Sequence, residues 1–332
     1  MNRLRSLFGA LTALIALAAG VKAEPELVTD KLGKKIDNVQ FIGLDNKPVP
    51  LSSLKDNKAV VIVFLSFDCP VSNSYAVTLA DLHKQFASQG VAFAAVSTSD
   101  DSGEVKKQAA EFKYPFPVYI DPKLDVVDAL KATTTPEAFV LDHNHVLRYR
   151  GRIDDGWSAR LKRAPRIAHF DLKDAIEDVL AGRAVKTPAV APIGCPVLAK
   201  GAVAKPSTTK LTYHKDVEPI LQTHCQDCHR PGAVGPFALM TYRQAVNWAD
   251  DIKAYTEDRR MPPWKPSAGA AFHGDRRLSA EEIKALAAWV DGGAPEGWWS
   301  MKRFKGFADA DGKFSSRVAR LRDRLTHPTS PE

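Results

Sequence analysis

Two long stretches of apolar residues stand out in the first half of the chain. The first covers residues 59–67 (AVVIVFLSF) and the second residues 91–99 (VAFAAVSTS). Continuous apolar runs of this length are typical of strands buried on both faces of a sheet. The segment between them, residues 77–87, has a helical pattern, so the three segments together predict a βαβ unit.

Three shorter strand-like segments follow, and they extend the prediction to an α/β fold for residues 24–185. These segments are residues 116–121, 137–142 and 146–154. His143-Asn144-His145 separates the last two, which predicts a hairpin. Pro136 comes directly before the second segment.

The second half of the chain has the period of helices. Residues 186–207 are rich in Ala, Pro and Val and predict a linker, and residues 208–299 predict a mostly α-helical domain. Within this domain we expect helices before Cys225, over residues 247–260 and over residues 280–291. Apolar side chains recur at helical spacing in the first and last of these: Val217, Ile220 and Leu221, then Ile283, Leu286, Trp289 and Val290.

The two ends of the chain differ from these domains. Residues 1–23 contain Arg3, Arg5, an apolar run and small residues near Ala23, which is the pattern of a cleaved secretory signal; an uncleaved anchor is the alternative. The apolar run is short for a membrane span. Residues 300–332 form a basic tail, and part of it predicts a helix with an apolar stripe: Phe314, Val318, Leu321 and Leu325.

The net charge of the 332-residue chain is +7, and most of it lies outside the two domains. Three cations fall in residues 1–23, and residues 300–332 hold eight Lys or Arg against four acidic residues. The remaining chain is therefore nearly neutral, which argues against a nucleic-acid-binding domain. We expect no transmembrane span once the signal is removed.

Residues 225–229 (CQDCH) have the Cys-x-x-Cys-His spacing of covalent haem attachment. Two thiols one helical turn apart can form thioethers with the porphyrin, and the adjacent histidine can bind the iron. We therefore predict one haem c per chain, held by Cys225, Cys228 and His229. A redox CxxC with an incidental histidine and half of a zinc site are the alternatives.

The sixth iron ligand is predicted to be Met261, because electron-transfer haems usually use methionine or histidine there. Met261 opens the segment MPPWKP, in which two prolines stiffen the backbone. His273 is the alternative ligand, and Met240 is interpreted as a core residue. His224 shares a helix with His229 and is interpreted as a surface or packing residue.

The segments YHKDVEPILQTHCQDCHRPGAVGPFALMTY, RRMPPWKP and LSAEEIKALAAWVDGGAPEG resemble a single-haem c-type cytochrome module of exported bacterial multidomain proteins. The resemblance covers roughly residues 210–299. It implies a periplasmic location, a haem iron bound by His229 and Met261, and one-electron transfer.

Cys69 follows the first apolar run and precedes Pro70, a residue suited to the first position of a helix. A thiol at a helix N-terminus meets unpaired N–H groups that favour its thiolate form. The position therefore predicts a reactive cysteine. A buried structural cysteine is the alternative, and the neighbouring Asp68 does not favour the thiolate.

Residues 28–185 resemble the redoxin (AhpC/TSA) branch of the thioredoxin superfamily, in which Cys69 takes the place of the attacking cysteine. Thr135-Pro136 matches the family's cis-proline step. The second cysteine of the two-thiol motif is replaced by Ser72. Similar sequences carry a Gly-Cys step after the domain, as in PIGCPV, and this resemblance motivates pairing Cys69 with Cys195. A free linker thiol is the alternative.

Together these features predict an exported, periplasmic oxidoreductase that combines thiol–disulfide exchange at Cys69 with electron transfer through haem. Its partners would be periplasmic redox proteins. A thiol peroxidase is one alternative, although Ile62 stands where the peroxiredoxin motif has proline. Ser66 fits that motif, and the candidate arginines for binding peroxide are Arg148, Arg150 and Arg152. The other alternative is a non-enzymatic electron carrier with a structural redoxin domain.

Overall fold

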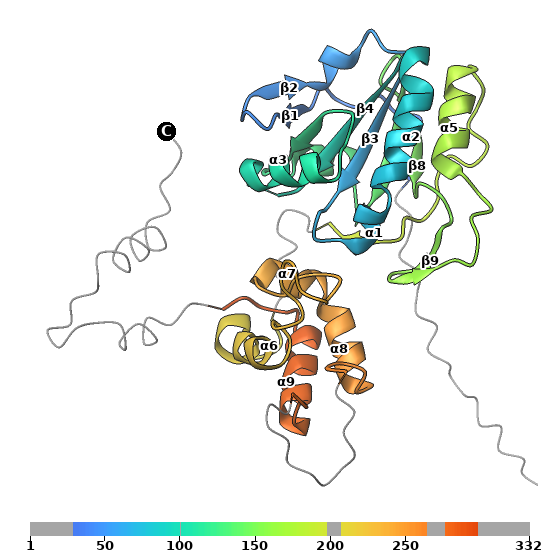
Figure 1. Cartoon of the computed structure of the whole chain (residues 1–332). Coiled ribbons are helices and arrows are strands. Elements are labelled where there is room, and N and C mark those ends of the chain that lie inside the picture. The colour runs from blue at the N-terminus through green and yellow to red at the C-terminus, as the bar shows by residue number, and fades with distance from the viewer. Residues whose placement is uncertain (1–28, 100, 198–206, 264–275, 298–332) are drawn as a thin grey trace, which may run out of the picture.

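The computed structural model describes residues 29–99, 101–197, 207–263 and 276–297. These residues form an α/β unit, which ends with residue 197, and a separate helical unit that begins at residue 207 (Figure 1). The predicted signal segment 1–23, His273 and the basic tail 300–332 lie outside the described residues.

A seven-stranded sheet forms the centre of the α/β unit, in the order β2-β1-β5-β4-β3-β7-β8. The strands are β1 (Gln40–Ile42), β2 (Pro48–Pro50), β3 (Ala59–Leu65), β4 (Val91–Ser97), β5 (Val118–Ile120), β7 (Glu137–Asp142) and β8 (Leu147–Gly151). β3 runs parallel to β4 and antiparallel to β7, and β7 pairs with β8 in the predicted hairpin.

Helices cover both faces of this sheet. They are α1 (Pro70–Ser74), α2 (Ala76–Phe86), α3 (Ser102–Glu111), α4 (Asp125–Leu130) and α5 (Asp171–Leu180), with short 3₁₀ turns at Leu51–Leu54 and Ala87–Gln89. Alternate residues of β3 point to opposite faces: Val61 and Val63 pack in the cluster that contains residues of α2 and α5, and Ile62 packs in the cluster that contains residues of α4. The continuous apolar run is explained by this double burial.

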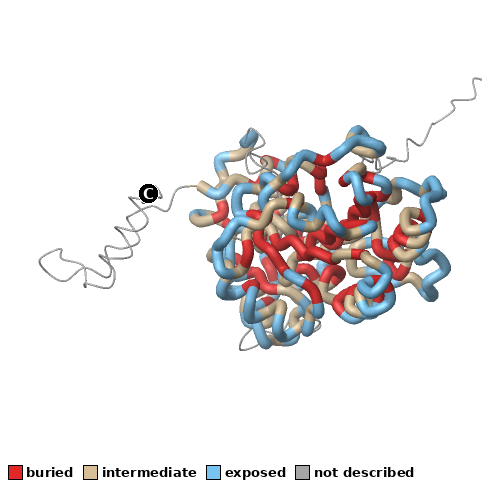
Figure 2. Tube along the Cα trace, turned by 90° about the horizontal axis from the view of Figure 1, so that it is seen from above, coloured by how far each residue is buried: buried red, intermediate tan, exposed pale blue. Residues whose placement is uncertain are grey.

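The arrangement confirms the expected thioredoxin-like α/β fold for the N-terminal part of the chain. The predicted βαβ unit is β3, α2 and β4, and the strand of residues 146–154 is shorter than predicted, since β8 ends at Gly151. Gly151 has φ +149°, and a side chain there would meet the backbone of Val190. Buried residues fill the interior of the molecule and exposed residues cover its outside (Figure 2).

The predicted linker is not free along its whole length, and this corrects the domain boundary at residue 185. The backbone N–H of Arg150 donates to Pro188 O, and that of Val190 donates to Arg150 O. Further on, β11 (Cys195–Pro196) pairs with β6 (Thr134–Thr135). The described part of the segment, residues 186–197, therefore belongs to the α/β unit.

The helical unit contains a π-helical turn η3 (Tyr213–Val217), α6 (Glu218–His224), α7 (Tyr242–Asn247), α8 (Ala249–Glu257) and α9 (Ala280–Asp291). The helix predicted over residues 247–260 is thus α8, preceded by a separate short helix α7. Leu286 and Trp289 of α9 are fully buried, as the predicted stripe requires. Side chains of Thr241 and Ser279 cap α7 and α9.

No helix in the described parts of the chain combines the length and apolar character needed to cross a membrane. Helices α7 and α8 contact the α/β unit. Their partners there include the short hairpin of β9 (Trp157–Ala159) and β10 (Lys162–Arg163) and the loops that contain Asp68 and Thr98. Figure 1 shows α7 on the side of the helical unit that faces α1.

Candidate functional site

Cys69 lies four residues after the end of β3 and immediately before α1, where Pro70 takes the first helical position. The thiol is fully buried, at 0% exposure. Its Sγ lies 3.2 Å from the carbonyl oxygen of Thr135, and the Thr135-Pro136 peptide bond is cis, as the family resemblance implied. The sequence therefore placed Cys69 and Pro136 correctly relative to each other.

Ser72, which occupies the position of a second cysteine, is buried and has a structural contact of its own. Its hydroxyl accepts a hydrogen bond of 3.2 Å from the backbone N–H of Ser66 at the end of β3. This contact ties the first turn of α1 to the strand that precedes it.

Cys195 reaches Cys69 because β11 pairs with β6, the strand that precedes Pro136. The register places Cys195 opposite Thr135. A side chain at Gly194 would collide with the carbonyl of Thr135, so the Gly-Cys step permits this close approach. The two sulfur atoms, 126 residues apart in sequence, lie 2.6 Å from each other as thiols.

The environment favours ionisation of Cys69 over ionisation of Cys195. Burial raises the pKa of Cys69, but hydrogen bonds from the Cys195 thiol and from the backbone N–H groups of Ser72 and Cys195, together with the charge of Arg160, lower it to about 7. The hydrogen bond to Cys69, and burial, raise the pKa of Cys195. Of the two thiols, Cys69 therefore ionises more readily, and Cys195 donates a hydrogen bond to it.

We expect the Cys69 thiol of the reduced protein to ionise with a midpoint near pH 7, below the usual thiol value of about 8.5. Above this midpoint Cys69 is mostly thiolate. The measurement is the ultraviolet absorbance of the thiolate, taken as the difference between the wild type and Cys69→Ala. Cys195→Ala should raise the midpoint, since it removes one hydrogen bond to the thiolate; a wild-type midpoint near the usual value would contradict the assignment.

Arg160 is a site residue that the sequence did not reveal. Its Nη2 lies 3.4 Å from Cys195 Sγ. The loop contains other cations, Lys162 and Arg163, and no spacing or neighbour in the sequence distinguishes Arg160 from them. Only its contacts in the folded chain identify it.

The three arginines considered as candidates for binding peroxide have other partners. Arg148 pairs with Asp142 at 2.7 Å, and Arg152 pairs with Asp171 at 2.7 Å. Arg150 is buried and pairs with Glu137.

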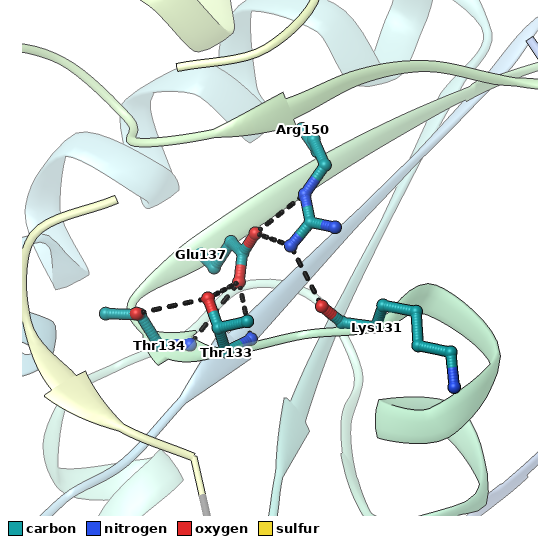
Figure 3. A network of polar contacts seen from close by, with 5 residues as sticks. All are labelled: Lys131, Thr133, Thr134, Glu137 and Arg150. Carbon is teal, nitrogen blue, oxygen red and sulfur yellow. Dashed lines mark hydrogen bonds and ion pairs between the residues drawn. The ribbon is translucent and has the colours of Figure 1, made fainter. Parts of the chain in front are cut away.

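The Arg150–Glu137 pair holds the backbone of residues 131–134 through a network of polar contacts (Figure 3). Glu137 Oε1 accepts hydrogen bonds from Arg150 Nε at 3.0 Å and Nη2 at 2.5 Å, and Nη2 also donates to Lys131 O at 2.9 Å. Glu137 Oε2 accepts from the backbone N–H groups of Thr133 at 2.8 Å and Thr134 at 3.4 Å. The carboxylate thereby fixes the backbone just before Thr135 and Pro136.

A cavity of 720 Å³ in the helical unit brings together the four residues predicted to hold haem. Cys225, Cys228, His229 and Met261 all line it. Most of its remaining lining is apolar or aromatic, including Leu239, Ile252, Tyr255 and Phe237, with a few charged side chains among them. Among the described residues, no group of three or more His, Cys, Asp and Glu side chains is arranged to hold a metal ion.

The orientation of His229 suits an iron ligand. Its Nδ1 lies 3.1 Å from Phe237 O, so Nδ1–H can donate to this carbonyl and leave Nε2 as the nitrogen with a free lone pair. Burial lowers the pKa of His229, which favours the neutral ring. A side chain at Gly235 would crowd His229 Nδ1 and the carbonyl of Cys228.

The other residues considered as ligands lie as follows. Met261 lies shortly after α8 and is 37% exposed, although it lines the cavity. Met240 is 42% exposed and is not in the cavity lining, so its interpretation as a core residue is wrong. His224 is a packing residue as predicted: Nδ1 contacts Arg276 O at 3.0 Å, and Nε2 contacts Glu282 at 3.1 Å.

Comparison with known proteins identifies the N-terminal part of the chain. Residues 32–150 match the AhpC/TSA family. This part, which contains Cys69 and Pro136, is therefore a redoxin domain with a thioredoxin-like fold; Arg160, Cys195 and the helical unit lie beyond the match. None of the curated proteins matches the chain.

Similar solved structures include two bacterial proteins at 28% identity with TM-scores of 0.46. An uncharacterized conserved protein from Geobacillus kaustophilus aligns over 50% of this chain and 90% of its own. A hypothetical protein from Sinorhizobium meliloti 1021 aligns over 50% of this chain and 93% of its own. The thioredoxin domain of a thiol-disulfide oxidoreductase from Bacteroides vulgatus has 18% identity and a TM-score of 0.36, and aligns over 45% of this chain and 97% of its own.

Proposed function

We propose that this protein is an exported oxidoreductase in which Cys69 and Cys195 form a reversible disulfide and exchange it with thiols of redox partners. The observation that carries the proposal is the 2.6 Å separation of the two sulfur atoms. A disulfide needs an S–S distance of about 2.0 Å, so the bond can close with only a small adjustment. The low pKa of Cys69 supports its role as the attacking thiol.

In the direction that reduces a partner, the Cys69 thiolate attacks one sulfur of the partner's disulfide. A mixed disulfide forms, and the leaving partner thiolate takes up a proton. Cys195 then loses its proton and attacks Cys69 Sγ, which releases the second partner thiolate. The partner gains two electrons and two protons, and the Cys69–Cys195 pair becomes a disulfide; the reverse sequence oxidises a dithiol partner.

The helical unit must move before a protein partner can reach the thiols. Cys69 and Cys195 are 0% and 3% exposed. At the start of α7, Arg243 donates to Thr98 O at 2.7 Å and Gln244 donates to Asp68 at 3.0 Å, so α7 bonds to the residue next to Cys69. Exchange therefore includes a step in which these contacts open.

The helical unit is proposed to carry one c-type haem, with the thiols of Cys225 and Cys228 as attachment points and His229 and Met261 as iron ligands. The shared cavity and the free Nε2 of His229 support this role. Bound haem would supply one-electron transfer. The chain's own residues would exclude water through the apolar lining and fix the His229 ring through its bond to Phe237.

A periplasmic location is proposed on the signal pattern of residues 1–23. A disulfide of this kind persists in such an oxidising compartment. The redox partners would be periplasmic proteins that exchange disulfides or single electrons.

Thiol peroxidase activity is the second candidate, and the match of residues 32–150 to the AhpC/TSA family favours it. In that reaction the Cys69 thiolate attacks one peroxide oxygen, the O–O bond breaks, and the other oxygen leaves as hydroxide or alkoxide and takes up a proton. Cys69 becomes a sulfenic acid. Cys195 then condenses with the sulfenic acid and releases water. A third candidate, a non-enzymatic electron carrier, would use the pair only as a structural disulfide.

The experiment mixes the reduced full-length protein with an oxidised disulfide peptide and counts the peptide thiols released in one turnover. Two thiols per protein are expected, with a Cys69–Cys195 link found by peptide mapping without reductant. Cys69→Ser should release none, and Cys195→Ser should stop at a mixed disulfide through Cys69. If the wild type releases no peptide thiols but is rapidly oxidised by hydrogen peroxide, the peroxidase is favoured. If it reacts with neither the peptide nor hydrogen peroxide, the structural disulfide is favoured.

A further inference from the structure

The hairpin formed by β9 and β10 is anchored to the redoxin side of the molecule. Trp157 Nε1 donates to Ser74 Oγ at 3.2 Å, which ties the hairpin to the end of α1. The approach to the hairpin is held by Asp154, whose Oδ1 accepts from Tyr75 Oη at 2.5 Å and from the N–H of Gly156 at 2.8 Å. The base of the hairpin is therefore fixed relative to Cys69, which caps α1.

The tip of the hairpin reaches the helical unit. Leu161 lines the 720 Å³ cavity. Arg160, the residue before it, is mostly buried: its side chain is 19% exposed. Arg160 is thus placed between the thiol pair on one side and the helices on the other.

The helical unit holds the Arg160 guanidinium by three contacts. Nη1 pairs with Asp251 at 2.7 Å, Nη2 donates to Asn247 O at 2.6 Å, and Cζ lies 3.7 Å from the ring centroid of Trp248. Asn247 is the last residue of α7, Trp248 lies between α7 and α8, and Asp251 is in α8. A planar guanidinium that is fixed at several points keeps its orientation. The Nη2 atom of Arg160 is thereby held 3.4 Å from Cys195 Sγ.

The same contacts continue towards the haem pocket. Trp248 stacks on Phe237 with ring centroids 3.6 Å apart and an interplanar angle of 10°. Phe237 in turn lies 4.6 Å from the ring of His229, measured between centroids, and its carbonyl is the partner of His229 Nδ1. A continuous series of side-chain contacts therefore joins Cys195 to His229 through Arg160, Trp248 and Phe237.

We propose that Arg160 is a positioning residue through which the helical unit sets the redox equilibrium of the Cys69–Cys195 pair. This inference rests on the proposed function of that pair. Arg160 contacts the Cys195 thiol, which in turn donates to the Cys69 sulfur, so its positive charge stabilises the Cys69 thiolate. That thiolate exists only in the reduced state, whereas a disulfide carries no charge for Arg160 to stabilise. Stabilising the reduced form makes a dithiol pair more oxidising.

The helices are necessary for this effect because they fix the side chain. Without Trp248 and the other contacts, the Arg160 side chain could turn to solvent, where its charge would be screened. By linkage, the coupling is reciprocal: closing the disulfide removes the charge that attracts Arg160, and so it weakens the contact between the two units. The contact is then strongest in the reduced protein.

The test equilibrates the full-length, haem-loaded protein with glutathione buffers, quenches with acid and counts alkylated Cys69 and Cys195 by mass spectrometry. This readout does not depend on haem absorbance or activity. Arg160→Met is expected to shift the equilibrium constant about five- to tenfold towards the disulfide, the size expected for losing one weak charge-assisted hydrogen bond. Arg163→Met is the matched control, because Arg163 lies on the same hairpin and stacks on Trp157 at 4.6 Å.

Trp248→Leu tests the part played by the helical unit. It should shift the equilibrium in the same direction as Arg160→Met, and the double variant should shift it no further than Arg160→Met alone. Since Trp248 is a core residue, thermal unfolding is measured alongside, and Trp248→Phe replaces Trp248→Leu if the latter is unfolded. The Phe variant should give a smaller shift in the same direction.

An unchanged equilibrium in Arg160→Met would overturn the inference, and so would additive effects of Arg160 and Trp248. An equal shift in Arg163→Met would also overturn it, because a general loss of charge would then explain the result. A wild-type protein without a two-electron thiol transition would instead refute the proposed function of the pair.

Discussion

Replacing Glu137 with leucine is expected to lower the free energy of unfolding by about 3–5 kcal/mol, because the charge of Arg150 is then buried without its partner. The side chains of Glu137 and Arg150 are 0% and 1% exposed. The change also removes the acceptor for the N–H groups of Thr133 and Thr134. Domains are commonly stable by about 5–15 kcal/mol, so a loss of this size is readily measured by urea unfolding.

A pair on the same two strands whose arginine is more exposed supplies the matched control. Arg148 pairs with Asp142 at 2.7 Å, but its side chain is 47% exposed, so Arg148→Met should cost about 1 kcal/mol or less. Adding Arg150→Met to Glu137→Leu should recover part of the loss, since an apolar pair leaves no buried charge. The interpretation fails if Glu137→Leu is no more destabilising than Arg148→Met.

The sequence predicted the centre of the fold because the relevant signals are local. Strands β3 and β4 are continuous apolar runs, since both faces are covered by other residues. The apolar stripe of α9 could also be predicted from the sequence, because its spacing depends on a single helix. Cys69 and Pro136 were identified through the family resemblance, which preserves their positions relative to the fold.

The parts that were not predicted depend on contacts between distant residues. Arg160 bonds to groups 35 and 87 residues away, and in sequence it is one cation among several in a polar loop. Residues 186–197 have the composition of a linker, yet their backbone groups pair with β8 and β6. Glu137 and Arg150 each resemble ordinary charged residues until the hairpin places them together in the interior.

The break between α7 and α8 illustrates a third limit. The sequence predicted one helix over residues 247–260, but the structure has two: α7 ends at Asn247, and α8 begins after Trp248 and ends at Glu257. Trp248 is buried and stacks on Phe237, so packing determines where the helix is broken. Propensity alone carries no information about such a contact.

Loss of haem is the second large effect that we expect. An exported protein with both Cys225→Ala and Cys228→Ala should retain no haem after denaturation in detergent, because no thioether bond can form. The wild type should retain one haem per chain under the same conditions. Cys69→Ser is the matched control: it removes a buried thiol outside the cavity, and it should retain haem fully.

Met261→Ala separates iron ligation from attachment. Since the thioethers involve Cys225 and Cys228, covalent haem should remain, while the ferric methionine–iron charge-transfer band should disappear. Met240→Ala, which changes an exposed methionine that does not line the cavity, should leave the band unchanged. If the band survives in Met261→Ala and is lost in Met240→Ala, the ligand is Met240; if the wild type shows no such band, a nitrogen ligand such as His273 takes the sixth position.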